Sequence, residues 1–294
     1  MTILLLGASP RLTWARSFLE APPIPAGGLP EIVVAEGAST REHLHSLMAK
    51  LVDDVVLVDH APFAGSAIPE SGMADAVRDE AQRAIFAYEL SRRAARTVLL
   101  APDESERWPA ALAALRRLPI TAELAAPPPL LPGAALIGRL PIGTYLGPLF
   151  AASGEGGSGG VGAAALRLLW PREAFLDGDA PGQSLPALVE VAGRARILAY
   201  GPYLPLPTGG WHAKAFLGFS PDIGKMSFIL EIDTGGAVSR GFFEVDRGGI
   251  FTLDLDFQVS DSLNPIEMRL ISQDSALEGQ VSLIEVELEL ITAA

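Results

Sequence analysis

The sequence predicts an α/β domain followed by an all-β domain. Short apolar runs alternate with helical patterns over residues 1–125, Pro- and Gly-rich stretches mark residues 126–185, and apolar and polar side chains alternate through much of residues 186–294. Helices between strands require crossover connections, and therefore a mostly parallel sheet covered on both faces in a three-layer arrangement. Strict alternation is typical of half-buried antiparallel strands, and here it predicts a jelly-roll-like β-sandwich.

The elements of the first domain follow from its periodicity. Strands are expected at residues 3–6, 31–35, 54–58 and 97–100, and helices at 12–19, opening at 39–42, at 73–95 and at 108–118. Ser39 and Glu42 have the spacing of a capping box, which predicts the start of the second helix.

The middle of the chain, residues 126–185, is expected to connect the two domains. It contains the triplet Pro127–Pro129, which favours extended geometry, and a glycine-rich run over Gly154–Gly160, which is typical of a flexible tether. A short helix is expected near residues 163–169. The β-sandwich is then expected from residue 186 to residue 294.

Alternation in the second domain assigns side chains to strand faces. Residues 226–232 and 251–259 place apolar side chains on one face, and Asp254 and Asp256 share the other. In the last strand, Val281 and Leu283 are expected on the same face as Glu285 and the glutamates that follow it. Solvated strand faces and edge strands commonly carry such charges.

Composition excludes several classes of function. The 294 residues include 22 Lys and Arg against 35 Asp and Glu, a net charge of −13, which argues against a generic binder of nucleic acid or anionic membrane. Because there is no cysteine, disulfides, thiolate zinc sites and cysteine nucleophiles are excluded. No metal site and no cofactor are predicted.

The apolar segments are too short for a membrane span. The N-terminal apolar run lacks the basic region of a signal peptide, and no stretch approaches the roughly 18–20 apolar residues that cross a bilayer. We therefore expect a soluble, cytoplasmic protein without a membrane span.

Candidate catalytic residues follow two predicted strands of the α/β domain. Ser9 comes after the first strand, and Asp59 and His60 come after the third. Ligands bind outside the carboxyl ends of strands in open α/β sheets, so these side chains could share one crevice, with Ser9 as nucleophile and His60 as base. The turn lacks the dinucleotide fingerprint. Helix capping or loop stabilisation is the alternative role.

Candidate carbohydrate-binding residues lie near the first long turn of the β-domain. They are Tyr200, Tyr203, Trp211 and His212. Aromatic rings stack on the C–H face of a sugar, while hydroxyl and imidazole groups can bond to its hydroxyls. The same residues could equally form the core of a sandwich, and both interpretations stay open.

The run Ala199–Pro207, with the sequence AYGPYLPLP, resembles the opening of a β-sandwich module of bacterial polysaccharide-biosynthesis proteins and glycosyltransferases. Trp211 stands where that module has a second aromatic residue, and Leu283–Leu290 supplies its closing strand. The resemblance covers about the last 105 residues. It implies a carbohydrate-binding jelly roll in a cell-surface glycan context, and it assigns no catalytic residues.

The first domain faintly resembles the SGNH-type hydrolases and their inactive relatives, because Ser9 follows the first strand. It departs from them in lacking Gly-Asp-Ser around Ser9 and a late Asp-x-x-His pair. Asp59 and His60 are adjacent and lie too early in the domain. These departures leave open whether the domain is an enzyme.

Three functions are compatible with these patterns. The leading hypothesis is a carbohydrate-binding accessory protein in bacterial exopolysaccharide or surface-glycan biosynthesis, with saccharides and other glycan-biosynthesis proteins as partners. The alternatives are a hydrolase or acyltransferase acting on esterified sugars, and a non-catalytic protein-assembly module.

Overall fold

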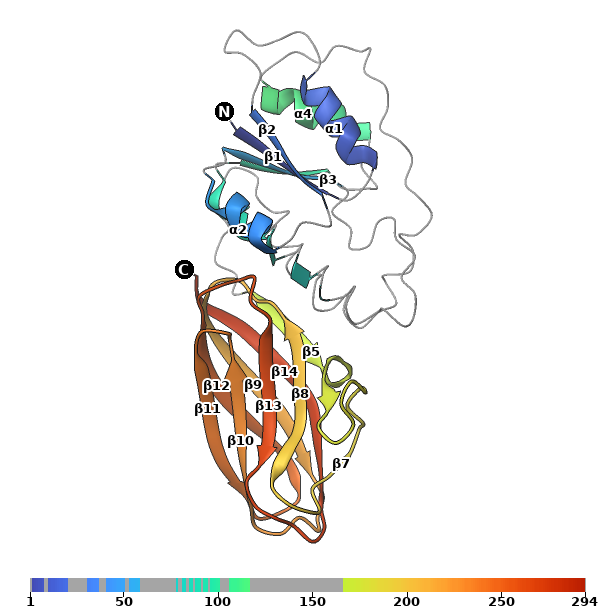
Figure 1. Ribbon diagram of the computed structural model, residues 1–294, viewed down its shortest axis with the longest axis vertical. Helices are drawn as coiled ribbons and strands as arrows, with labels where there is room; N and C mark the ends of the chain where they lie inside the picture. The colour runs from blue at the N-terminus through green and yellow to red at the C-terminus, as the bar shows by residue number, and fades with distance from the viewer. Residues whose placement is uncertain are drawn as a thin grey trace. The chain divides into compact units, whose positions relative to one another are not determined.

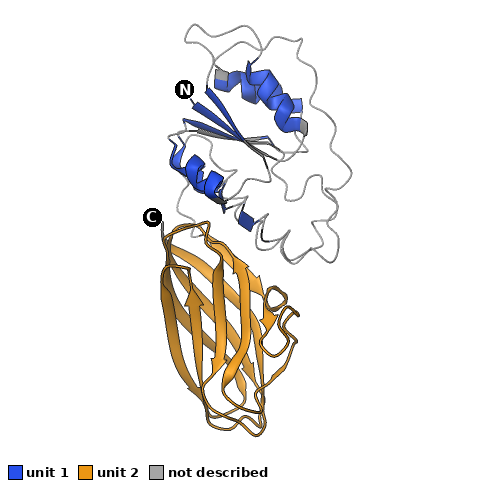
Figure 2. Ribbon diagram, viewed as in Figure 1, with its two compact units in different colours: residues 1–162 blue, residues 163–294 orange. Residues whose placement is uncertain are grey.

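The computed structural model describes residues 2–7, 10–20, 31–36, 41–50, 53–58, 96–100, 106–116 and 166–293, with short helical pieces between 78 and 94. The chain divides into two compact units, residues 1–162 and residues 163–294 (Figure 2).

Unit 1 contains a four-stranded sheet in which every pair of neighbours is parallel. Its strands are β1 (Thr2–Gly7), β2 (Glu31–Glu36), β3 (Asp54–Val58) and β4 (Arg96–Leu100), in the order β2-β1-β3-β4. Helices α1 (Pro10–Glu20) and α4 (Trp108–Arg116) lie on one face of the sheet, and α2 (Arg41–Met48) lies on the other (Figure 1). The parallel pairing agrees with the alternation of strands and helices in the sequence.

A hydrophobic core holds α1 and α4 against this sheet. Ile3 and Leu5 alternate along β1, so both side chains face the same side and are fully buried. They pack in one cluster with Phe18 of α1 and with Trp108 and Leu112 of α4. Burial of side chains this large contributes about 1.5–3 kcal/mol each, which explains why these short helices are stable here. Within the described residues, no helix is both long and apolar enough to cross a bilayer.

Unit 2 is an antiparallel β-sandwich. Its strands are β5 (Arg167–Pro171), β6 (Leu176–Asp177), β7 (Val189–Glu190), β8 (Arg196–Leu204), β9 (Gly209–Phe219), β10 (Met226–Asp233), β11 (Val238–Val245), β12 (Gly249–Val259), β13 (Ile266–Ser272) and β14 (Gln280–Ala293). A short 3-10 turn (Arg172–Ala174) follows β5.

The strand order of unit 2 is that of a jelly roll. One sheet has the order β11-β10-β13-β8-β6, and the other has β12-β9-β14-β5 with β7 paired to β14 (Figure 1). Between β5 and β8, and then along β8–β14, the chain crosses to the opposite sheet at every connection except the β10–β11 hairpin. The predicted all-β sandwich is confirmed.

The sandwich core consists of side chains that alternate inward from both sheets. Trp211, Ala213 and Leu217 of β9 are buried, and they face buried residues of the other sheet such as Phe228. Phe219 and Phe228, from opposite sheets, have ring centroids 5.2 Å apart. Alternation therefore assigns the inner face of each strand.

The predicted boundary at residue 186 is wrong, because the sandwich begins about twenty residues earlier. Residues 167–171 form strand β5, which pairs with β14, in place of the helix expected near 163–169. Leu168 and Trp170 are buried while Arg167 is exposed, so this segment already has the period of a strand. The glycine-rich run and the proline triplet lie outside the described residues.

A bulge in β14 overturns the face predicted for its first half. The register with β9 shifts between Leu283 and Glu285, so Val281 and Leu283 point into the core together with Val286. Glu285 and Glu287 point outward. An inserted residue reverses the parity of a strand, and alternation in the sequence alone cannot locate it.

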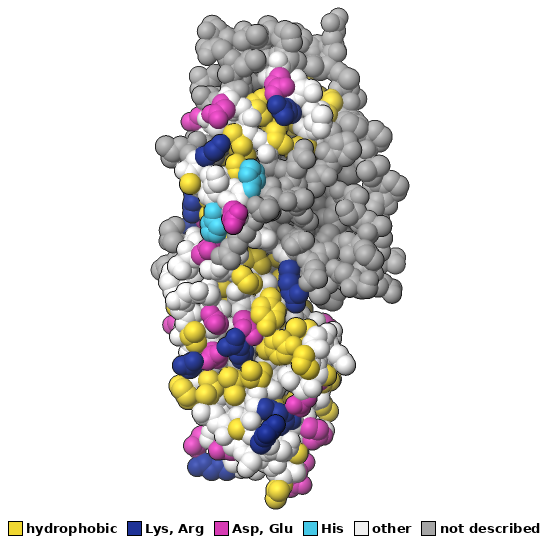
Figure 3. Space-filling view, in the orientation of Figure 1, with side chains coloured by type: hydrophobic (Ala, Val, Ile, Leu, Met, Phe, Trp, Pro, Cys, Tyr) yellow, Lys and Arg dark blue, Asp and Glu magenta, His cyan; other side chains and the backbone are white. Residues whose placement is uncertain are grey.

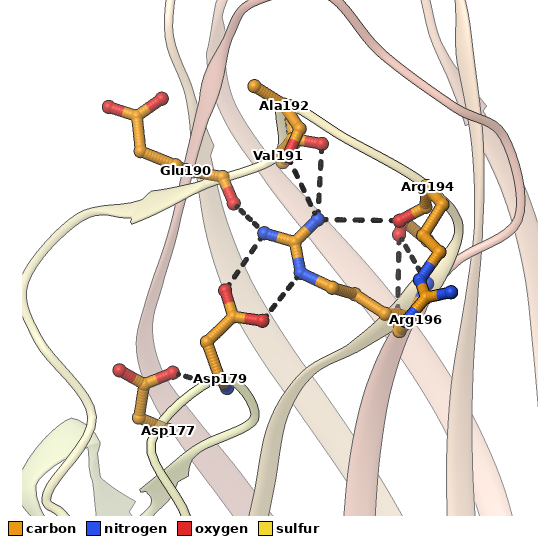
Figure 4. Close-up of polar contacts among 8 residues, drawn as sticks. Asp177, Asp179, Glu190, Val191, Ala192, Arg194 and Arg196 are labelled. Atoms are coloured by element: carbon orange, nitrogen blue, oxygen red, sulfur yellow. Dashed lines mark hydrogen bonds and ion pairs between the residues drawn. The ribbon is translucent and has the colours of Figure 1, made fainter.

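The segment before β8 is fastened by the side chain of Arg196. Its guanidinium bonds to both carboxylate oxygens of Asp179 and to the main-chain carbonyl oxygens of Glu190, Val191, Ala192 and Arg194 (Figure 4). These contacts hold residues 177–194 against β8, next to the candidate site described below.

Candidate functional site

A bulge in β8 brings Tyr200 and Tyr203 to the same face of the sheet. Residues three apart in a regular strand point to opposite faces. Here Pro202 pairs with Glu267 and Leu204 with Ile266, so the register shifts by one residue and Tyr203 is the inserted residue of the bulge. The two rings meet edge to face, with centroids 6.2 Å apart and planes at 73°.

The backbone at Tyr203 is strained. Its φ of 63° lies in the left-handed region, as does the 115° of Gly201, and for a tyrosine this costs of order 1–3 kcal/mol. The Tyr203 hydroxyl donates a hydrogen bond of 2.8 Å to Oε1 of Glu267, which offsets part of that cost. Strained residues are concentrated at functional sites, because the surrounding structure must maintain them.

A ladder of ion pairs runs from these tyrosines across the outer face of the sheet. Glu267 contacts Nη2 of Arg269, and Nη1 of Arg269 donates to Oε1 of Glu231 at 2.7 Å. Arg240 donates from Nε to Oε2 of Glu231 at 2.6 Å. The ladder spans β8, β13, β10 and β11 and positions the carboxylate that holds Tyr203.

The pKa values of Tyr203 and Glu231 are shifted in the directions that preserve their hydrogen bonds. Burial raises the pKa of Tyr203 to about 12, together with its hydrogen bond to Glu267, so the phenol remains a donor. Burial acts to raise the pKa of Glu231, but hydrogen bonds from Arg240 and Arg269 outweigh burial and hold it below its usual value.

Tyr200 lies beside Tyr203 and contacts the segment 177–194 that Arg196 holds against β8. Its hydroxyl accepts a hydrogen bond of 3.3 Å from the backbone N–H of Gly182, and its ring stands opposite Arg269 in the strand register. Both tyrosine residues are partly exposed. We call Tyr200, Tyr203, Glu267 and Arg269 the tyrosine cluster. It combines aromatic faces for stacking with fixed carboxylate and guanidinium groups for hydrogen bonds.

An apolar row lies beside the ladder on the same outer face. It consists of one residue from each of four neighbouring strands: Phe242, Ile229, Ile271 and Ile197. Phe242 is 66% exposed and Ile197 is 39% exposed. Figure 3 shows hydrophobic side chains on this face next to charged ones. Below, these four residues are called the apolar row.

Trp211 is not available to a ligand. Its ring is fully buried in the sandwich core, and its Nε1–H donates to the carbonyl oxygen of Pro207 at 2.8 Å. Its proposed contact with a saccharide is therefore wrong, and the alternative interpretation as a core residue holds. The signal was present in the sequence, because all apolar residues of β9 except Phe216 have the same parity as Trp211.

His212 lies on the opposite sheet, away from the tyrosine cluster. It points outward from β9, between Asp254 and Asp256 of β12. The Nδ1 to Oδ1 distance to Asp256 is 2.7 Å, and the Nε2 to Oδ1 distance to Asp254 is 3.1 Å. The hydrogen bond to Asp256 raises the pKa of His212, and the one to Asp254 adds to this effect. The four predicted carbohydrate-binding residues therefore do not form one site. The two tyrosines lie on the outer face of one sheet, His212 lies on the outer face of the other, and Trp211 lies in the core.

The charged members of the site were not among the predicted residues. Glu231, Glu267 and Arg269 occur at outward positions of alternating strands, which marks them as surface residues. Their grouping depends on which strands are neighbours, and the sequence does not show that pairing.

The predicted catalytic residues Ser9, Asp59 and His60 lie outside the described residues. The strands that precede them are neighbours, since Leu6 of β1 pairs with Leu57 of β3. The order β2-β1-β3-β4 reverses direction between β1 and β3, which is the switch point where open α/β sheets bind ligands. Among the described parts of the chain, no group of three or more His, Asp or Glu could hold a metal ion.

Solved structures similar to this chain are β-sandwich modules of low identity. They include the CBM22-1 xylan-binding domain of Xyn10C from Paenibacillus barcinonensis (TM-score 0.30, 10% identity, 43% of this chain and 95% of that one). They also include the K1 adhesin domain of Lys-gingipain from Porphyromonas gingivalis (0.32, 13%, 43% and 99%) and CBM35 of Abf62 from Cellvibrio japonicus (0.25, 12%, 44% and 94%). No protein-family model and no curated protein sequence matches the chain. At these scores the likenesses assign neither a family nor a function.

Proposed function

We propose that the β-sandwich binds a saccharide at the tyrosine cluster. The observation that carries this proposal is the bulge at Tyr203, which costs backbone strain and yet brings two tyrosine rings to one partly exposed face. Glu267 and Arg269 stand beside the rings with fixed geometry. Ring faces can stack on sugar C–H groups, while the ionic groups bond to hydroxyls.

The wider role we propose is that of an accessory protein in bacterial exopolysaccharide or surface-glycan biosynthesis, acting in the cytoplasm. The support is the resemblance of the run Ala199–Pro207 to modules of polysaccharide-biosynthesis proteins and glycosyltransferases. This run contains both tyrosines of the cluster.

Calorimetric titration of the full chain with a panel of neutral and acidic oligosaccharides tests the binding. Tyr200→Ala and Tyr203→Ala should each reduce affinity at least tenfold for any saccharide that the unchanged chain binds. Phe216→Ala is the matched control, since Phe216 is a partly exposed aromatic residue on the opposite sheet. Absence of binding to every saccharide, or equal losses in all three variants, would contradict the proposal.

A second candidate function belongs to unit 1. The switch point between β1 and β3 supports a ligand site at their carboxyl ends, where Ser9, Asp59 and His60 follow in the chain. Hydrolysis or acyl transfer on esterified sugars would use Ser9 as nucleophile and His60 as base. Turnover of acetylated sugars that survives unchanged in Ser9→Ala would remove this candidate.

A further inference from the structure

Strand β11 is the edge strand of its sheet. It pairs with β10 over eight residues in unbroken antiparallel register, and no described strand pairs with its other side. An edge strand presents a row of unpaired backbone N–H and C=O groups that can pair with another strand. Bulges, prolines and inward-pointing charges prevent such pairing, and β11 has none of them. Its edge is therefore suited to β-sheet extension.

The outward side chains of β11 are complementary to themselves. Arg240, Phe242 and Glu244 follow one another on the outer face and are 53%, 66% and 62% exposed. When two copies of this strand pair antiparallel about Phe242, Arg240 of each lies opposite Glu244 of the other. Opposite charges and aromatic pairs at such positions stabilise a sheet by roughly 0.2–1 kcal/mol each.

The contacts within the chain leave both charged groups able to make this pairing. Arg240 donates to Glu231 from Nε, and its guanidinium has further N–H donors. Glu244 contacts Nζ of Lys225 through Oε2, at 3.1 Å. A carboxylate accepts several hydrogen bonds, so a second cation can join it.

Strand β12, one of the two edge strands of the other sheet, carries like charges on its outer face. Strand β12 presents Asp254 and Asp256 outward, and both side chains are at least half exposed. Antiparallel self-pairing of β12 through this segment would place like charges near each other, which is destabilising. Charge complementarity therefore favours β11 over β12 for contact with a second copy.

We propose that two copies of this chain associate through β11, antiparallel about a two-fold axis at Phe242. The sheet β11-β10-β13-β8-β6 then continues into the second copy, and the apolar row of one copy extends into that of the other. This inference does not depend on saccharide binding. If the tyrosine cluster binds saccharide, the dimer carries two such sites on one shared sheet and gains avidity for a polymer.

Exchange of charges tests the register. Arg240→Glu and Glu244→Arg should each leave the chain monomeric in sedimentation equilibrium, because each places like charges opposite one another. An equimolar mixture of the two variants should recover the doubled mass, since every cross-strand pair then joins opposite charges. An unchanged chain that stays monomeric across the concentration series, or a mixture of variants that does not associate, would overturn the proposal.

A single introduced cysteine tests the position of the axis. The chain contains no cysteine, so Phe242→Cys provides one reactive group per copy. Directly opposed residues in antiparallel strands have Cα atoms about 4.5–5.5 Å apart, within the reach of a disulfide. Phe242→Cys should form a covalent dimer on mild oxidation, and Ile250→Cys, at a 73% exposed position of β12, should not. Equal yields would indicate random collision and contradict the two-fold contact.

Discussion

Arg196 and Asp179 form a two-point ion pair that joins strand β8 to the segment before it. Nε of Arg196 lies 2.8 Å from Oδ1 of Asp179, and Nη2 lies 2.9 Å from Oδ2 (Figure 4). The same guanidinium also donates to four backbone carbonyl oxygens, with Nη2 and the oxygen of Glu190 only 2.6 Å apart. A planar group with five donors satisfies such a cluster, and the single ammonium group of lysine cannot.

Replacement of Arg196 should therefore destabilise the sandwich. Arg196→Lys loses the two-point geometry and leaves part of the carbonyl cluster unpaired, so we expect a loss of roughly 2–3 kcal/mol in the free energy of unfolding. Urea denaturation followed by tryptophan fluorescence measures this loss. Arg194→Lys is the control, because only the backbone oxygen of Arg194 takes part in the cluster. Equal stability of the two variants would show that the ion pair contributes little.

The His212 contacts predict a stability that depends on pH. Both imidazole nitrogens can donate to Asp256 and Asp254 only when the ring is protonated. The pKa of His212 is higher in the folded protein than the ordinary value of 6.5, so its contribution is fully present below pH 6.5 and lost as pH rises through the folded pKa. His212→Gln should therefore have a lower melting temperature than the unchanged chain. The difference should be largest at about pH 6 and should decrease at higher pH.

Removal of the carboxylate provides the matched comparison for His212. Asp256→Asn eliminates the strongest cause of the raised pKa, so it should reduce the same pH dependence. Parallel melting curves for the unchanged chain and both variants between pH 6 and pH 9 would rule out this coupling.

Substitutions at Trp211 and Tyr200 should have different effects: the first should mainly lower stability, and the second should mainly weaken saccharide binding. Trp211→Phe leaves the carbonyl oxygen of Pro207 without its donor and the core underfilled, which should cost about 1–3 kcal/mol. Tyr200→Ala should weaken saccharide binding with a smaller effect on unfolding, because its ring is partly exposed. Calorimetric titration and urea denaturation of both variants measure the two effects. A Trp211→Phe protein that is folded but binds less saccharide would contradict the assignment of Trp211 to the core.

Periodicity predicted the strands but not their irregularities. Residues 54–58 form β3 as expected, and the alternation predicted for residues 226–232 and 251–259 corresponds to the inward and outward faces of β10 and β12. The bulges at Tyr203 and after Leu283 depend on pairing with strands distant in the chain, so local alternation carries no sign of them. Because of the first bulge, Tyr200 and Tyr203 lie on the same face of the sheet, whereas a regular strand would place them on opposite faces.

Glu231 should make the outer face of the sheet sensitive to acid. Its side chain is only 8% exposed and accepts from both Arg240 and Arg269, which hold its pKa below the ordinary value of 4.5. A depressed pKa gives stability that is present above pH 4.5 and lost as pH falls through the folded pKa. Glu231→Gln should therefore be less stable than the unchanged chain at pH 7, by about 2–4 kcal/mol, because the partly buried guanidinium of Arg269 and the exposed one of Arg240 lose their shared carboxylate. The difference should shrink as pH falls below 4.5 in urea denaturation, whereas Glu278→Gln, at an exposed position, should have little effect at either pH. A difference that stays constant down to acid pH would show that the ladder stabilises the sheet through packing, with no contribution from the charge of Glu231.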